Sequence, residues 1–89
     1  MEHLKHELER WLCEQFPHAD VLLQFSPLAQ NVGGYLVWEG FVNKEPSDRQ
    51  HLLSMAIRAR FSRDDQRFIS LIVTLTPNEY AVMREPQMA

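Results

Sequence analysis

The chain has 89 residues, the size of one small domain, and its 45% hydrophobic and 24% charged residues exclude a disordered chain or a fibrous repeat. Its net charge of -3 is the wrong sign for a protein that binds nucleic acid mainly by neutralising phosphates. The single Cys13 excludes an internal disulfide and a zinc site with two thiolates, and no stretch reaches the roughly 18 apolar residues of a membrane span. We expect one cytoplasmic domain over residues 1–89 that has no membrane contact and binds a partner rather than catalysing a reaction, because so small a domain leaves little room for a deep catalytic cleft.

The first predicted element is an amphipathic helix over residues 2–15. Its apolar residues recur at helical spacing on one side, and its acidic residues are left for solvent. Pro17 ends this helix, because the residue before a proline is pushed out of the helical region. The side that we expect to pack on the core consists of Leu4, Leu8, Trp11 and Leu12.

A β-hairpin with a long loop is predicted next. One strand begins at Asp20 as DVLLQF, and the other resumes at Tyr35 as YLVWEGF, with SPLAQNVGG between them. We expect Gly33 and Gly34 to be turn glycines in this loop that supply positive φ angles. The residues of the second strand alternate between two faces, and both faces are too apolar to tell which one meets the core.

A second helix is predicted over residues 47–61. Ser47 followed three residues later by Gln50 matches a capping box, and apolar residues follow at helical spacing. The polar stretch SRDDQ then leads into RFISLIVTL, whose β-branched residues predict a largely buried strand. A short third helix opens with Thr76 as its N-cap, Pro77 at its first position and Glu79 at its third.

The predicted order of elements is helix, strand, strand, helix, strand, helix. We expect a three-stranded sheet with the helices packed on one face, which makes an α+β domain of αββαβα order. No serine stands in the Gly-flanked turn of a nucleophilic enzyme, and no Gly-rich phosphate-binding motif is present. His3 and His6 share a helix face, but two imidazoles alone make only a weak metal site. We therefore expect no catalytic residue, no metal site and no cofactor.

Three stretches of the chain are similar to the BolA family, namely WEGF, VNKEPSDRQHLLSMAI and ISLIVTLTPNEY. The family pattern is a strand that ends in Phe, a short turn, an Arg that opens a helix, and a later strand that closes in Thr-Pro-x-Glu. Phe41, Arg49 and the run Thr76, Pro77 and Glu79 fall at these positions, and the resemblance covers about residues 19–80. It implies an αββαβα fold that is related to class II KH domains.

The departures from the family pattern concern its iron–sulfur site. In BolA-like proteins a His near the start of the third strand, and a His or Cys between the first two strands, help to ligate a cluster that is shared with a monothiol glutaredoxin. This chain has Phe68 at the first position and neither ligand between Ser26 and Gly34. Gln50 and Asn43 also stand where the family has His and Gly. The resemblance thus implies a monothiol glutaredoxin as a candidate partner, without cluster ligands from this chain.

The leading hypothesis is an adaptor or regulatory module that binds a protein through the start of the second helix and the turn before it. The expected contact residues are Lys44, Arg49 and Gln50, and Arg49 would form a bidentate pair with a partner carboxylate. The alternative is a surface Arg49 that pairs with Glu45 or with solvent. A second hypothesis is KH-like nucleic-acid binding, although the chain has no GxxG loop. That function would use the arginines at and beyond the end of the second helix: Arg58, Arg60, Arg63 and Arg67.

Overall fold

The structure is a computed structural model that describes residues 2–84. The predicted α+β class and αββαβα order are confirmed. An additional single turn, α3, lies within the SRDDQ stretch, where the Ser62 Oγ accepts a hydrogen bond from the Asp65 N–H (3.1 Å) and caps the turn. The elements in chain order are α1 Glu2–Gln15, β1 Asp20–Ser26, β2 Asn31–Val37, a 3₁₀ turn η1 at Glu39–Phe41, α2 Pro46–Arg60, α3 Arg63–Gln66, β3 Ile69–Leu75 and α4 Pro77–Arg84.

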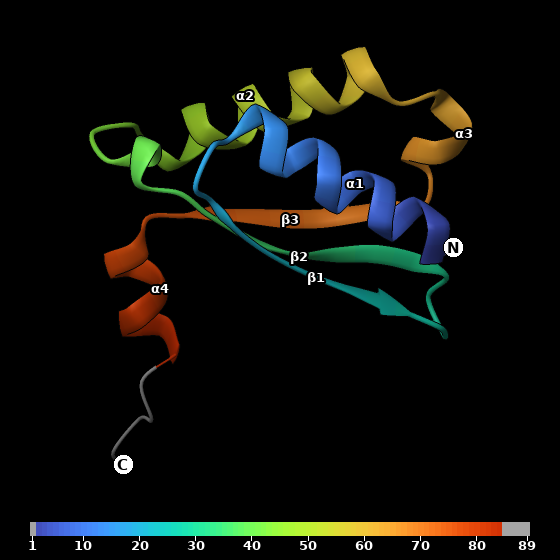
Figure 1. The fold of residues 1–89 in the computed structure, drawn as a ribbon, viewed down its shortest axis with the longest axis horizontal. Helices are drawn as coiled ribbons and strands as arrows, with labels where there is room; N and C mark the ends of the chain where they lie inside the picture. Colours follow the sequence, from blue (N-terminus) through green and yellow to red (C-terminus); the bar gives the residue numbers. More distant parts are fainter. Residues whose placement is uncertain (1, 85–89) are drawn as a thin grey trace.

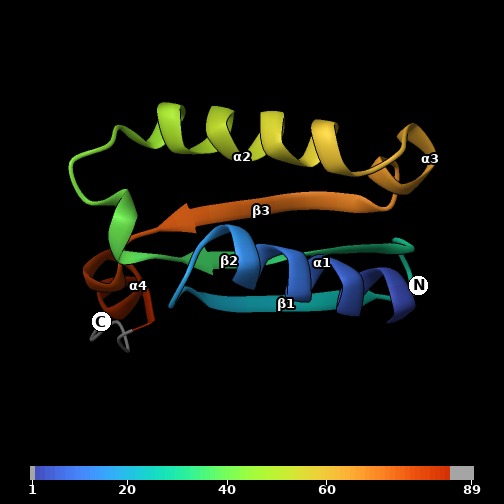
Figure 2. The ribbon, with the colours of Figure 1, turned by 45° about the horizontal axis from the view of Figure 1, so that its top comes forward.

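The three strands form one mixed sheet in the order β1-β2-β3. β1 pairs antiparallel with β2, and β2 pairs parallel with β3, with Leu36 of β2 opposite Thr74 of β3. β2 is therefore the central strand, and β1 and β3 are edge strands. The prediction that the helices pack on one face of the sheet is right for α1 and α2 but wrong for α4, which lies on the other side at the end of β3 (Figure 1). Figure 2 shows α2 running beside β3, and α1 lying over the other two strands.

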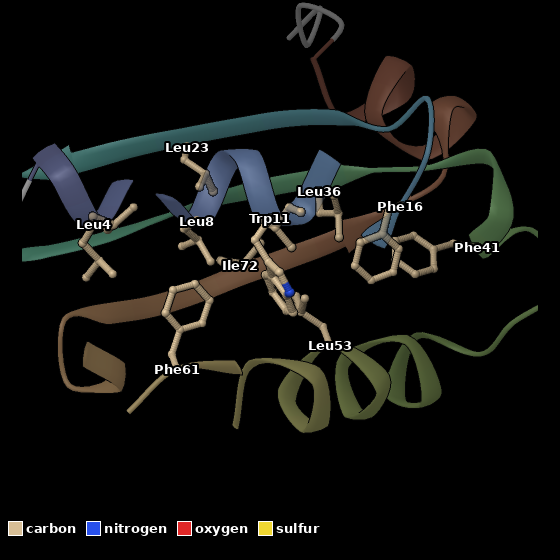
Figure 3. Close-up of a cluster of buried hydrophobic side chains, with 12 residues drawn as sticks. Leu4, Leu8, Trp11, Phe16, Leu23, Leu36, Phe41, Leu53, Phe61 and Ile72 are labelled. Atoms are coloured by element: carbon tan, nitrogen blue, oxygen red, sulfur yellow. The ribbon is translucent and has the colours of Figure 1, made fainter. Parts of the chain in front are cut away.

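The hydrophobic core fills the space between the sheet and the two long helices (Figure 3). All four residues of the predicted apolar side of α1 are buried, which confirms that prediction. Leu36 of β2 is buried in this core, whereas its neighbour Tyr35 faces the opposite side and packs against Tyr80 of α4, with ring centroids 6.1 Å apart. The tertiary structure thus decides which face of β2 meets the core. The remaining core residues are Phe16, Leu23, Val32, Phe41, Leu53, Phe61 and Ile72.

The hairpin loop is shorter than predicted, because β2 begins at Asn31 and includes both glycines. The prediction that Gly33 and Gly34 belong to the turn is wrong. A Cβ at Gly33 would overlap the Ser70 Oγ, and one at Gly34 would overlap the Leu22 carbonyl oxygen. Both positions therefore require glycine for the close approach of neighbouring strands. Gly34 does have a positive φ of 147°, but it lies at the register shift in the β2–β3 pairing.

The second strand also ends earlier than predicted, at Val37 instead of running through WEGF. The chain turns into η1 after Trp38, whose backbone N–H still donates to the Leu75 carbonyl (2.9 Å). This turn carries Phe41 into the core, where its ring packs against Phe16 at a centroid distance of 5.7 Å. Burial of the Phe41 ring therefore fixes this bend, which the strand-like composition of WEGF did not predict.

The start of α2 differs from the prediction as well. The helix begins at Pro46 with Glu45 as its N-cap, and no side chain makes a capping hydrogen bond there. The predicted capping box of Ser47 and Gln50 is therefore wrong. Pro46 supplies the start of the helix, because its fixed φ suits the first helical position and its missing N–H would have had no partner inside the helix.

β3 is less buried than predicted. Ile72 and Thr74 face the helices and are buried, whereas Leu71 on the opposite face is 68% exposed. The reason is the layered arrangement, in which α1 and α2 cover one face of the sheet and leave much of the other open (Figure 1). An apolar strand at the edge of such a sheet buries alternate residues only.

Candidate functional site

Arg49 is the centre of the site that the sequence pointed to, and its side chain lies inside the protein. The residue is 5% exposed. Its Nε donates to the Lys44 carbonyl oxygen (2.9 Å), its Nη1 donates to the Glu79 Oε1 (2.6 Å), and its guanidinium lies over the Phe41 ring at 6.0 Å. The expectation of a surface arginine that pairs with Glu45 is wrong. Arg49 instead joins the turn before α2 to the first turn of α4.

The Glu79 carboxylate, which accepts the hydrogen bond from Arg49, also caps α4. The Thr76 N–H donates to the Glu79 Oε1 (2.8 Å), and the Glu79 N–H donates to the Thr76 Oγ1 (3.2 Å). This reciprocal pair confirms the predicted helix start at Thr76, Pro77 and Glu79. The hydrogen bond from Arg49, followed by that from the Thr76 N–H, lowers the pKa of Glu79, while partial burial opposes the shift. Glu79 is therefore a stable anion at neutral pH.

Gln50 joins α2 to the outer edge of β3. Its Oε1 accepts hydrogen bonds from both the backbone N–H and the Oγ1 of Thr74, each at 2.8 Å. Because Thr74 is buried, these bonds satisfy two polar groups that would otherwise lose water without replacement. Lys44, the third predicted contact residue, is exposed, and its backbone carbonyl rather than its side chain accepts a hydrogen bond from Arg49. Arg49 and Gln50 thus line one pocket with side chains that are bonded within the chain, whereas Lys44 contributes only its carbonyl oxygen.

A pocket of about 340 Å³ opens beside these bonds, between the start of α2, the outer edge of β3 and the first turn of α4. We call it the α2–β3 pocket. Aliphatic side chains supply much of its wall, and the exposed Leu71 stands on its rim. Leu71 and Val73 also line a broader hollow of about 580 Å³ on the open face of the sheet. The residues of the α2–β3 pocket are Pro46, Arg49, Gln50, Leu71, Val73, Thr74, Leu75 and Glu79.

The four arginines of the nucleic-acid hypothesis all lie at the end of the molecule where α2 passes into α3 (Figure 2). Two of them face carboxylates: the Arg60 Nη2 donates to the Glu7 Oε1 (3.0 Å), and the Arg67 Nη2 lies 3.8 Å from the Asp64 Oδ1. Arg58 and Arg63 are exposed, and no carboxylate oxygen of residues 2–84 lies within 4.0 Å of them. The basic charge of this end is therefore partly balanced within the chain.

The residues considered for metal chemistry are spread over the surface. His3 and His6 are exposed and lie near carboxylates of their own helix, at 4.0 Å from the Glu7 Oε2 and 3.5 Å from the Glu9 Oε1, respectively. Within the part of the chain that the structure describes, no group of three or more His, Cys, Asp or Glu side chains could hold a metal ion. Cys13 is exposed. Phe68 packs against the core.

Sequence reasoning missed two roles at this site. Glu79 was predicted as a helix cap, but its pairing with Arg49 joins residues 30 positions apart, and no local pattern indicates such a contact. Leu71 lies in an apolar run that predicts burial, so its exposure on the rim of a pocket was not expected. The edge position of β3 is the missing information, and it follows from the order of the strands.

No protein-family model matches the chain, and neither a curated protein nor a solved structure is significantly similar to it. None of the helices within residues 2–84 combines the length and the apolar composition that crossing a membrane requires. The case for a function therefore depends on the site itself and on the motif residues that it contains.

Proposed function

We propose that this protein is a small, non-enzymatic BolA-like adaptor that acts through contact with a protein partner at the α2–β3 pocket. The observation that carries the proposal is the pocket itself: an aliphatic hollow of about 340 Å³ beside the outer strand β3, with the exposed Leu71 on its rim. Exposed apolar surface rimmed by polar groups is typical of protein interaction sites. The first partner to test is a monothiol glutaredoxin.

The arrangement of the motif residues supports this proposal. Phe41, Arg49 and Glu79, which carry the BolA resemblance, are far apart in the sequence and meet at one place in the fold. The Arg49 guanidinium lies over the Phe41 ring and binds Glu79, which in turn caps α4 with Thr76. Arg49 and Glu79 of this cluster line the α2–β3 pocket, where they would hold the contact surface in shape for a partner.

The proposed adaptor does not contribute cluster ligands of its own. Phe68 has no atom that could bind iron, and the hairpin between β1 and β2 contains no His or Cys. Binding of a glutaredoxin would therefore depend on protein contact alone, and a cluster that the glutaredoxin carries would keep its own ligands.

The proposal is tested by adding apo and cluster-loaded monothiol glutaredoxin to isotopically labelled protein. We expect backbone amide shifts in residues 47–50 and 71–75, with unchanged visible absorption and circular dichroism of the cluster. Leu71→Ser should weaken binding, whereas the matched change Leu28→Ser, at a 100% exposed leucine on the hairpin loop, should not. Altered cluster spectra would contradict the absence of ligands, and a lack of amide shifts with both forms would contradict glutaredoxin as the partner.

Nucleic-acid binding is the second candidate, and the exposure of Arg58 and Arg63 is the observation that favours it. Binding that depends on phosphates weakens steeply as salt rises, because counterions are released on association. A gel shift with single-stranded RNA at low ionic strength, lost in Arg58→Ala and Arg63→Ala and reversed by salt, would support this candidate. Retention of the same shift in both variants would contradict it.

A further inference from the structure

The side of α2 that faces away from the core carries exposed apolar residues. On the inner side of the helix Leu53 points into the core (Figure 3), and on one flank the Arg60 Nη2 donates to the Glu7 Oε1 of α1. Leu52 and Met55 lie on the opposite side, where they are 44% and 53% exposed. Because residues three apart are neighbours on a helix surface, these two side chains form one continuous apolar patch.

Charged residues lie at the two ends of this patch. Asp48 precedes Leu52 by four residues and Arg58 follows Met55 by three, so all four residues lie on the same half of the helix. Both charged side chains are exposed, and no oppositely charged group among residues 2–84 lies within 4.0 Å of either one. Along the helix axis the two charges stand about 15 Å apart, at about 1.5 Å per residue. The outer face of α2 consists of Asp48, His51, Leu52, Met55, Arg58 and Ala59.

The outer face of α2 is complementary to itself in the antiparallel orientation. When two copies of the helix lie antiparallel, Asp48 of each copy stands beside Arg58 of the other, and the apolar patches meet between the two ion pairs. In the parallel orientation each Asp48 would face its counterpart, and so would each Arg58, so that like charges would repel at both ends. Charge therefore selects the antiparallel arrangement.

The charge balance of the outer face favours a second copy of this chain over a different protein. One carboxylate and one guanidinium leave the face without net charge while His51 is neutral, so it has no excess charge to attract a partner of the opposite sign. A two-fold axis uses the same surface on both copies, and it gives every Asp48 and every Arg58 a partner.

We propose that the outer face of α2 is a homodimer interface, in which two copies pack α2 against α2 in the antiparallel orientation. This inference goes beyond the proposed function, because the α2–β3 pocket lies at Arg49 and Gln50 on other sides of the helix and stays open in the dimer. A single pair of helices buries less than the roughly 800 Å² per partner of a stable complex. The dimer is therefore reversible, with a dissociation constant on the order of 0.1 mM.

Sedimentation equilibrium of the full chain, without any partner, measures the self-association. We expect a change from monomer to dimer between about 10 µM and 1 mM, with concentration-dependent amide shifts in residues 48–59. Met55→Lys should abolish the dimer, because it places two like charges at the centre of the apolar contact. Val82→Lys is the matched control, at a 67% exposed valine of α4 on the other side of the sheet, and should leave the dimer unchanged.

Charge exchange provides the decisive comparison. Asp48→Arg and Arg58→Glu should each weaken self-association by about tenfold or more, because like charges then meet at both ends of the contact. An equimolar mixture of the two variants should associate again, because one copy carries arginine at both ends and the other carries a carboxylate at both ends. Arg84→Glu, an exposed arginine on α4, is the control and should associate like the wild type. Circular dichroism verifies that all variants are folded.

The proposal is overturned if the protein stays monomeric at about 1 mM, if Met55→Lys still dimerises, or if the mixture associates no better than its two components. Single charge variants that associate like the wild type would also reject the antiparallel contact. These outcomes are separable from failure of the proposed function, because no glutaredoxin is present. Leu71→Ser, which should weaken partner binding, should leave self-association unchanged, and loss of the dimer in that variant would place the contact at the pocket instead.

Discussion

Arg49 holds three parts of the chain together through a single guanidinium. It binds the turn before α2 through the Lys44 carbonyl, covers the buried Phe41 ring and receives the Glu79 carboxylate from α4. A guanidinium suits this position because its donors are arranged in a rigid fork and its planar face can lie over an aromatic ring. At the residue scale, Arg49 therefore lines the α2–β3 pocket and holds its walls in place, and in the proposed function it would act on a partner through this geometry.

Removing the guanidinium should destabilise the protein measurably. We expect Arg49→Met to lower the free energy of unfolding by about 2–3 kcal/mol, because the change breaks hydrogen bonds to a charged group in a buried site. Glu79→Gln should cost about 1 kcal/mol, because the Glu79 side chain is 41% exposed and water screens the pair. Urea unfolding followed by circular dichroism measures both, and the double variant should cost less than the two changes added together. Equal stability of Arg49→Met and wild type would contradict this role.

The lowered pKa of Glu79 predicts a specific acid sensitivity. The carboxylate is favoured in the folded state, so its contribution to stability is fully present above its ordinary pKa of 4.5. That contribution should be lost as the pH falls through the lower pKa of the folded protein, because protonation then removes the negative charge that pairs with Arg49. Urea midpoints between neutral and acid pH should converge for wild type and Glu79→Gln. Glu14→Gln, at an exposed position on α1, is the control and should stay parallel to wild type.

At the scale of elements, α2 is fixed more by its contact with β3 than by its own cap. The helix has no capping bond from a side chain, although Ser47 and Gln50 have the spacing of a capping box. The Gln50 side chain instead reaches the edge of β3 and binds Thr74. The bond places one flank of α2 along the strand, which gives the α2–β3 pocket one of its walls.

This difference between a local cap and a tertiary bond can be measured. We expect Gln50→Ala to lower the free energy of unfolding by about 1–3 kcal/mol, because it leaves two buried polar groups of Thr74 without their partner. Ser47→Ala should change stability by less than about 0.5 kcal/mol, because Ser47 is exposed and makes no capping bond. Urea unfolding of both variants tests the pair. A larger cost for Ser47→Ala than for Gln50→Ala would indicate a capping box after all.

At the scale of the whole molecule, one cluster of buried residues connects α1, the sheet, η1 and α2. Both tryptophans belong to this packing: Trp11 contacts Phe61, and Trp38 contacts Phe41, with ring centroids 5.4 and 5.2 Å apart. The Trp38 Nε1 also donates to the Pro17 carbonyl (2.9 Å), which ties the chain after α1 to the end of β2. The helices and the sheet therefore lose their packing together when the core opens.

We accordingly expect unfolding in a single transition. Tryptophan fluorescence reports the contacts of the aromatic rings, and far-ultraviolet circular dichroism reports the helices and strands. The two urea curves should coincide, as they do for small domains with one cooperative core. A fluorescence transition that precedes the loss of circular dichroism would contradict a single core and would indicate that α1 or η1 detaches first.

The sequence by itself determined the elements whose signals are local. The bounds of α1, the position of β1 and the Thr76–Glu79 helix start were correct, because helical spacing, Pro17 and reciprocal capping act over a few residues. The loop around Gly33 and Gly34 was misplaced, because glycines that permit close strand contact look the same in sequence as glycines in a turn.

Only the tertiary structure decided the site. Contacts between residues that are distant in the chain decide which face of β2 meets the core, bury Arg49 against Glu79 and place β3 at the edge of the sheet. Residue periodicity defines the faces of an element, but it does not say what covers each face. Leu71 and Ile72 are an example: they are adjacent in one apolar run, yet Leu71 is exposed on the rim of the pocket and Ile72 is buried in the core.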